Sequence, residues 1–118
     1  MTTTAKGVVY EQQAAVFLQQ RGLVLVTRNF RCHGGELDLV MRDGDTLVFV
    51  EVRYRASKWF GGAAASIDRR KQQRLITAAH QYLQQNLNDC PCRFDVIAIS
   101  GSGAFTWLRS AFHVHDAD

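Results

Sequence analysis

The sequence has few residues of several types, and each shortage excludes a class of protein. Its three cysteines are an odd number, whereas a disulfide framework uses an even one, so we expect reduced thiols and a cytoplasmic location. One proline and nine glycines are too few for a linker-rich or disordered chain. No apolar run approaches the roughly 20 residues needed to cross a bilayer, and residues 1–6 lack the apolar segment of a signal peptide.

What the chain does contain is typical of one globular domain. It has 118 residues, 47% of them hydrophobic, which is enough to form a packed core without a metal or a disulfide. We expect a single domain over 1–118, with a core at about 5–112 and a flexible tail at 113–118. The formal net charge of +3 mildly favours a polyanionic partner.

Hydrophobic periodicity and turn residues predict seven elements. Two segments have helical spacing, namely 5–21, which Gly22 ends, and 68–87, which Asp68 begins. Five segments are typical of strands: 23–30, 36–42, 46–54, 93–100 and 104–112. Residues 55–66 read as a mobile loop. The order αβββαββ, without repeats, predicts an α/β fold with a central mixed sheet flanked by two helices.

Glutamate is scarce, because the chain has only Glu11, Glu36 and Glu51. Glu11 falls near the middle of the apolar stripe of the first helix, together with Val8, Ala14, Ala15 and Leu18. A buried carboxylate is costly unless it is paired. Two interpretations remain open from this segment: a buried functional carboxylate, or an edge position from which the side chain reaches water.

The other two glutamates lie on the strands of a predicted hairpin around Asp43-Gly44-Asp45. Side chains alternate along a strand, so loop length sets which residues face each other. A two-residue loop at 43–44 places Glu36 opposite Glu51, whereas one at 44–45 places Asp38 there. Either loop gathers on one face Glu36, Asp38, Glu51, Arg53, Val40, Leu47 and Phe49, and on the other Leu37, Leu39, Met41, Val48, Val50 and Val52. A three-residue loop would instead separate Asp38 from Glu51.

Carboxylates gathered on a half-apolar face require a compensating cation. Two of them about 4 Å apart repel by about 4 kcal/mol at an effective dielectric constant near 20. Arg53 is one candidate, and a divalent metal such as Mg²⁺ is the other. A surface ladder of cross-strand ion pairs is the third interpretation, and the pattern alone leaves all three open.

Several strings of residues resemble one bacterial family. They are GELDLV at 35–40, LVFVEVRYR at 47–55, KQQRL at 71–75, the pairs Ala78-Ala79 and Tyr82-Leu83, and RFDV at 93–96. Together they resemble the YraN family, which is uncharacterised but similar to archaeal Holliday-junction resolvases and to the PD-(D/E)xK nuclease superfamily. The resemblance runs from about Gly7 to Ile99.

This resemblance implies a restriction-endonuclease-like core and a metal-dependent endonuclease acting on structured or branched DNA. The acidic positions of the nuclease pattern fall on Asp38, Glu51 and the helical Glu11, which would hold Mg²⁺ or Mn²⁺ with the carbonyl group of Val52. Glu36 would orient these ligands. The pattern's lysine falls on Arg53, the fourth catalytic candidate. Relatives among the resolvases act as dimers, so the resemblance also implies a homodimer by analogy.

Arg53 departs from the nuclease pattern, because arginine stays protonated and cannot act as a base. It can still bind a phosphate with two hydrogen bonds. The alternative function is therefore a non-catalytic nucleic-acid-binding domain that keeps the nuclease fold. Lys58 and Lys71 are candidates for the missing amine, although nothing in the sequence places either of them at the site.

Basic residues cluster in two places where an anion could bind. Cations in the first turn of a helix oppose its dipole, which makes sense if an anion docks there. The predicted nucleic-acid contacts in and near the second helix are Arg69, Arg70, Lys71 and Arg74, and those near the loop are Arg55 and Lys58. The neighbouring Trp59 and Phe60 could stack on bases or pack on the domain edge or another protein. In that last case the chain would be an interaction protein.

Overall fold

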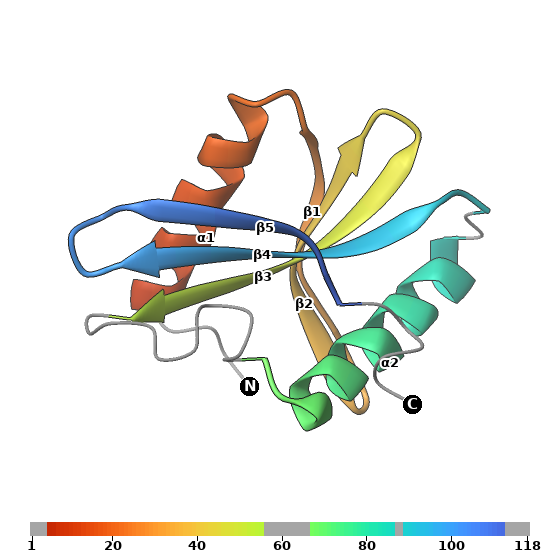
Figure 1. Ribbon diagram of the computed structural model, residues 1–118. Helices are drawn as coiled ribbons and strands as arrows, with labels where there is room; N and C mark the ends of the chain where they lie inside the picture. The colour runs from red at the N-terminus through yellow and green to blue at the C-terminus, as the bar shows by residue number, and fades with distance from the viewer. Residues whose placement is uncertain (1–4, 56–66, 87–88, 113–118) are drawn as a thin grey trace.

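The computed structural model describes residues 5–55, 67–86 and 89–112, and it contains seven elements in the predicted order αβββαββ (Figure 1). The helices are α1 (Ala5–Gln19) and α2 (Arg69–Asn86). The strands are β1 (Val24–Cys32), β2 (Gly35–Asp43), β3 (Thr46–Arg55), β4 (Cys92–Ser100) and β5 (Phe105–Phe112). The predicted tail, and the predicted loop apart from Arg55, lie outside the described residues.

The five strands form one mixed sheet in the order β1-β2-β3-β4-β5. All neighbouring pairs are antiparallel except β3 and β4, which are parallel. A parallel pair needs a long crossover connection, and α2 lies within the segment that joins β3 to β4. This confirms the α/β class and the mixed sheet.

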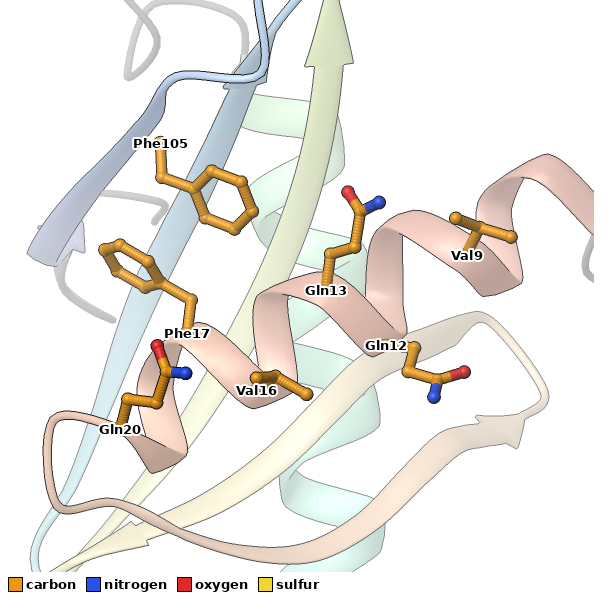
Figure 2. A pocket seen from close by; sticks show the side chains of 7 residues that line it. All are labelled: Val9, Gln12, Gln13, Val16, Phe17, Gln20 and Phe105. Atoms are coloured by element: carbon orange, nitrogen blue, oxygen red, sulfur yellow. The ribbon is translucent and has the colours of Figure 1, made fainter.

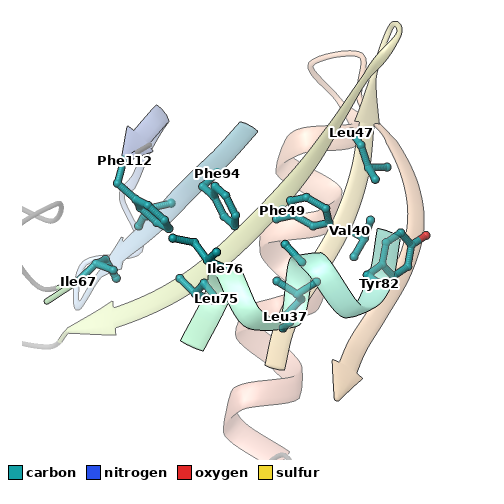
Figure 3. Close-up of a cluster of buried hydrophobic side chains, with 13 residues drawn as sticks. Leu37, Val40, Leu47, Phe49, Ile67, Leu75, Ile76, Tyr82, Phe94 and Phe112 are labelled. Atoms are coloured by element: carbon teal, nitrogen blue, oxygen red, sulfur yellow. The ribbon is translucent and has the colours of Figure 1, made fainter. Parts of the chain in front are cut away.

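One helix covers each face of the sheet, so the domain has two hydrophobic cores. Under α2, Leu75, Ile76 and Tyr82 pack against Val40, Phe49 and strand residues of β4 and β5 (Figure 3). Under α1, Ala14, Ala15 and Leu18 pack against Met41, Val48, Val50 and Ile97. Val8, which was predicted to lie in this apolar stripe, is 39% exposed instead.

The predicted helix ends have the expected local structure. Gly22 has a φ of 97°, and the amide of Leu23 donates a hydrogen bond of 3.1 Å to the Leu18 carbonyl, which closes the end of α1. Asp68 precedes α2, and its Oδ1 accepts a hydrogen bond of 2.8 Å from the Lys71 amide. Asp68 is therefore the N-cap residue.

The hairpin between β2 and β3 has the two-residue loop at 44–45, because Asp43 pairs with Thr46. Gly44 has a φ of 61°, which a glycine adopts without strain. One part of the predicted facing pattern is wrong: Leu37 packs under α2 with Val40, not with Leu39 under α1 (Figure 3). Strict alternation fails at this point because β2 leaves its partner β3 just beyond Leu39.

Within the described residues, none of the helices combines the length and apolar character that a membrane-spanning segment needs.

Candidate carboxylate site

The candidate site lies where the sheet divides between β2 and β3. Their ladder runs from Asp43–Thr46 only as far as Leu39–Val50. Beyond that pair, β3 stays paired with β4 and β2 stays paired with β1. Figure 1 shows the start of β2 and the end of β3 running apart from this point. A divided sheet leaves backbone groups that need other partners.

Asp38 and Glu51 occupy the next position after the last pair of the ladder. The Oδ2 atom of Asp38 accepts a hydrogen bond of 2.8 Å from the Val52 amide, so a side chain replaces the missing rung. Continuing the observed register places Asp38 opposite Glu51, as predicted for the loop at 44–45. Glu51 is buried with 4% exposure, and Asp38 is half-buried.

Glu11 comes to the same place from α1. It is only 7% exposed, so the interpretation in which it reaches water from an edge position is wrong. Its carboxyl group forms hydrogen bonds with Asp38 and with Asn29. The rings of Tyr10 and Tyr54 stack at 4.3 Å, which joins α1 to β3 beside the carboxyl groups.

Asn29 is the site residue that sequence reasoning missed. It lies in β1 between the pairs Arg28–Leu39 and Phe30–Leu37, at the level of Asp38. Its φ is 52°, a left-handed conformation that is strained within a strand and that asparagine tolerates better than most residues. The Asn29 side chain interacts with the Glu11 carboxyl group and lowers its pKa. Nothing in the sequence around Asn29 indicates a positive φ.

Two cations approach the carboxyl groups from different elements. Arg53 Nη1 lies 3.4 Å from Glu51 Oε2, and so does Lys71 Nζ, which comes from the first turn of α2. Both distances are long for charge-assisted hydrogen bonds. The structure thus places Lys71 at the site. Lys58, the other candidate for the missing amine, lies outside the described residues.

The carboxyl groups disfavour one another's ionisation. Burial raises the pKa of Glu51 to about 8, and repulsion from Asp38 adds to this effect, whereas Lys71 and Arg53 oppose it. Burial and repulsion from Asp38 also raise the pKa of Glu11 to about 7. Burial raises the pKa of Asp38 although the Val52 amide favours its ionised form. Burial and mutual repulsion therefore favour the protonated forms of these carboxyl groups.

Two buried oxygen atoms test whether a divalent cation fits. Oε1 of Glu11 and Oε1 of Glu51 are both buried without a hydrogen-bond partner. Unpartnered carboxylate oxygens beside a third carboxylate are the donor set that Mg²⁺ and Mn²⁺ prefer. Across residues 5–55, 67–86 and 89–112, however, no three acidic, histidine or cysteine side chains already surround a metal position. The donor types fit a metal ion, and the predicted metal site stays a prediction.

The remaining predicted residues surround this cluster at different depths. Glu36 is half-buried, pairs with Arg31 at 3.5 Å and contributes to the raised pKa of Glu11 and of Asp38. The predicted nucleic-acid contacts that are exposed are Arg55, Arg69, Arg70 and Arg74. Val52 contacts the site through its amide, and its carbonyl stays a predicted ligand.

A separate groove of about 490 Å³ lies on the outer side of α1 (Figure 2). It is lined by Val9, Gln12, Gln13, Val16, Phe17 and Gln20 of α1 and by Phe105 of β5. Among the described residues, none of the side chains that line this groove is ionisable, so they offer it neither an acid nor a base.

The comparisons with known proteins agree with the resemblance. The model of the uncharacterised protein family UPF0102 matches residues 10–99. A UPF0102 protein of Nitrosomonas eutropha is 54% identical over 94% of this chain and 96% of its own length. One from Janthinobacterium sp. is 60% identical over 86% of this chain and 81% of its own, and one from Pseudomonas putida is 54% identical over 92% and 94%. The chain therefore belongs to family UPF0102, which confirms the predicted membership of the YraN family.

Proposed function

We propose that this protein is a metal-dependent endonuclease that hydrolyses phosphodiester bonds in structured or branched DNA. One observation carries the proposal: carboxyl groups from α1, β2 and β3 meet where the sheet divides, with two cations beside them. The same placement of acidic residues on a mixed sheet supports a restriction-endonuclease-like core.

Glu11, Asp38 and Glu51 would hold Mg²⁺ or Mn²⁺. A bound ion of this kind lowers the pKa of a water molecule and neutralises charge on a phosphate. The protein supplies the rest: the Val52 amide fixes Asp38, Asn29 orients Glu11, and Arg53 offers a fork of donors to a phosphate oxygen. The exposed arginines at the start of α2 would bind the DNA backbone.

Cleavage assays with the full chain test this proposal. The substrates are branched, flapped, single-stranded and linear duplex DNA in Mg²⁺ or Mn²⁺. We expect cleavage that EDTA stops and that is lost in Asp38→Asn and Glu51→Gln. Asp45→Asn is the matched control, because it removes a carboxylate from the exposed hairpin turn. Full activity in both site variants would eliminate the proposal.

A second function is favoured by Arg53, which holds the position of the nuclease lysine and cannot become a base. In this case the domain binds DNA without cutting it. Binding that weakens with salt would then survive Glu51→Ala, and could tighten as repulsion from phosphate disappears. Calorimetric titration with Mn²⁺ separates the two functions. Only the endonuclease must bind the ion, and Glu51→Ala should abolish that binding.

The proposed cellular setting and assembly follow from the same chemistry. The thiols of Cys32, Cys90 and Cys92 are free, which supports the predicted cytoplasmic location. A four-way junction presents two equivalent strands, so symmetric cleavage by a domain with one site needs two copies. We therefore expect a homodimer on junction DNA, which light scattering would detect as a complex containing two chains.

A further inference from the structure

Lys71 reaches the carboxyl groups from α2, which lies in the connection between β3 and β4, and not from β3 itself. The chain has three lysines, and Lys71 is the one whose side chain belongs to the described residues. Its Nζ atom lies 3.4 Å from Glu51 Oε2, and the side chain is 27% exposed. The ammonium group therefore contacts a buried carboxylate and still meets solvent, where a substrate would arrive.

The backbone that carries Lys71 is held firmly. Its amide donates to Asp68 Oδ1 at 2.8 Å, and the side chain of Gln72 donates to the Ile67 carbonyl at 3.0 Å. One turn later, α2 lies directly on β2, because a Cβ atom at Gly35 would overlap the carbonyl oxygen of Arg74. The first turn of α2 thus has a fixed position relative to the strand that carries Asp38.

The charge of Lys71 opposes the dipole of α2, since a cation in the first turn of a helix is disfavoured by a few tenths of a kcal/mol. Anions compensate for this placement: Glu51 is in contact, and Asp38 also interacts with the ammonium group.

We infer that Lys71 is a catalytic residue of the proposed endonuclease. Its ammonium group donates a hydrogen bond to a non-bridging oxygen of the phosphate that is cleaved, while it stays in contact with Glu51. No proton leaves the lysine in this role; it stabilises negative charge that grows on the phosphate during hydrolysis. The inference rests on the proposed function. It assigns the missing amine to Lys71 of α2, because the strand position of the nuclease lysine holds Arg53, which is not an amine.

The test compares Lys71→Met, which keeps most of the length of the side chain and removes its charge, with Arg21→Met. Arg21 lies just beyond the far end of α1, about 15 Å along the helix axis from Glu11, and its removal costs the chain the same charge. Three quantities are measured for each: the single-turnover cleavage rate of branched DNA in Mn²⁺, the DNA dissociation constant in EDTA, and the melting temperature.

We expect Lys71→Met to lower the cleavage rate by about 100-fold or more, as for loss of one donor to a developing oxyanion. The dissociation constant in EDTA should rise by less than about tenfold, since one phosphate contact is lost among several. Arg21→Met should leave the rate unchanged. For Lys71→Ala, added ethylammonium should restore part of the rate, which it would not do for a variant with a disturbed fold.

The two hypotheses fail in different ways. If the unaltered protein cleaves, if Asp38→Asn abolishes cleavage, and if Lys71→Met with an unchanged melting temperature keeps its rate within about threefold, the role of Lys71 is refuted alone. An equal loss of rate and of binding in EDTA also refutes it, because Lys71 would then serve affinity only. If the unaltered protein cleaves none of the substrates, the proposed function and this inference are both wrong.

Discussion

Replacing Glu51 by glutamine should make the metal-free protein more stable at alkaline pH. Glu51 is 4% exposed, and its Oε1 atom has no hydrogen-bond partner. Burial and the neighbouring Asp38 raise its pKa from 4.5 to about 8. Glutamine has nearly the same shape but never ionises, so it removes the cost of a buried charge that Lys71 and Arg53 compensate only in part.

The direction of the pH effect follows from which state, folded or unfolded, binds the Glu51 proton more tightly. Because the pKa is raised in the folded protein, the folded state keeps a proton between pH 4.5 and about 8 that the unfolded chain has already lost. The free energy of unfolding therefore falls as the pH rises through this window. At 1.36 kcal/mol per pH unit the full difference amounts to about 5 kcal/mol. Repulsion from Asp38 is shared by both carboxyl groups, so we expect about 2–3 kcal/mol from Glu51 alone.

Urea unfolding in EDTA between pH 5 and pH 9, followed by circular dichroism, measures this effect. The unaltered protein should lose stability across the range, whereas Glu51→Gln should lose less and be the more stable of the two at pH 8. Adding Mg²⁺ at pH 8 should stabilise the unaltered protein and not the variant, since a ligand that binds only the folded state raises its stability.

Glu36→Gln is the matched control, because Glu36 is half-buried and forms a partly exposed ion pair with Arg31. Such a pair contributes at most about 1 kcal/mol. Parallel pH curves for Glu51→Gln and the unaltered protein would refute the reasoning, and so would a Glu51→Gln variant that is the less stable of the two at pH 8 in EDTA.

Three further substitutions test how the site is held. Asp95→Asn should lower the free energy of unfolding by about 2–4 kcal/mol. The buried carboxylate accepts hydrogen bonds from Arg93, Trp107 and the Ser110 amide. A loss below 0.5 kcal/mol, roughly the scatter of surface changes, would contradict this. Gly35→Ala should cost about 1–3 kcal/mol through overlap with α2, and should also slow cleavage by displacing Lys71; unchanged values would show that α2 can shift freely. Asn29→Gly should relieve about 1 kcal/mol of backbone strain. It should also slow cleavage, because Glu11 loses its amide partner. Equal cleavage rates in the variant and the unaltered protein would exclude a positioning role for Asn29.

Much of the fold could be predicted because its signals are local. The apolar stripe of Leu75, Ala78 and Tyr82 predicted the buried face of α2, and Asp68 and Gly22 predicted where helices begin and end. The hairpin itself was predictable from Asp43-Gly44-Asp45, but its loop length and register stayed open until the structure showed the loop at 44–45. That register brings Asp38 level with Glu51.

Prediction failed where the structure breaks a regular pattern. Leu37 was assigned to the wrong face because alternation assumes a continuous ladder, and the ladder between β2 and β3 ends at Leu39. Asn29 was missed because a positive φ within a strand leaves no sequence signal. Asp95 belonged to a family string, and only its contacts with Trp107 and Ser110 show that it joins β4 to β5.

By itself the sequence left the facing of Asp38 and Glu51 open, because that depends on the length of the hairpin loop. It did determine the elements, their order and the scarcity of glutamate that drew attention to Glu11. These depend on local conformational preferences and on the period of each element. Only the tertiary structure decided that Glu11 is buried against Asp38 and that the amine beside Glu51 comes from α2. Such contacts join segments far apart in the chain, and they depend on how closely each helix packs on the sheet, which no local pattern specifies.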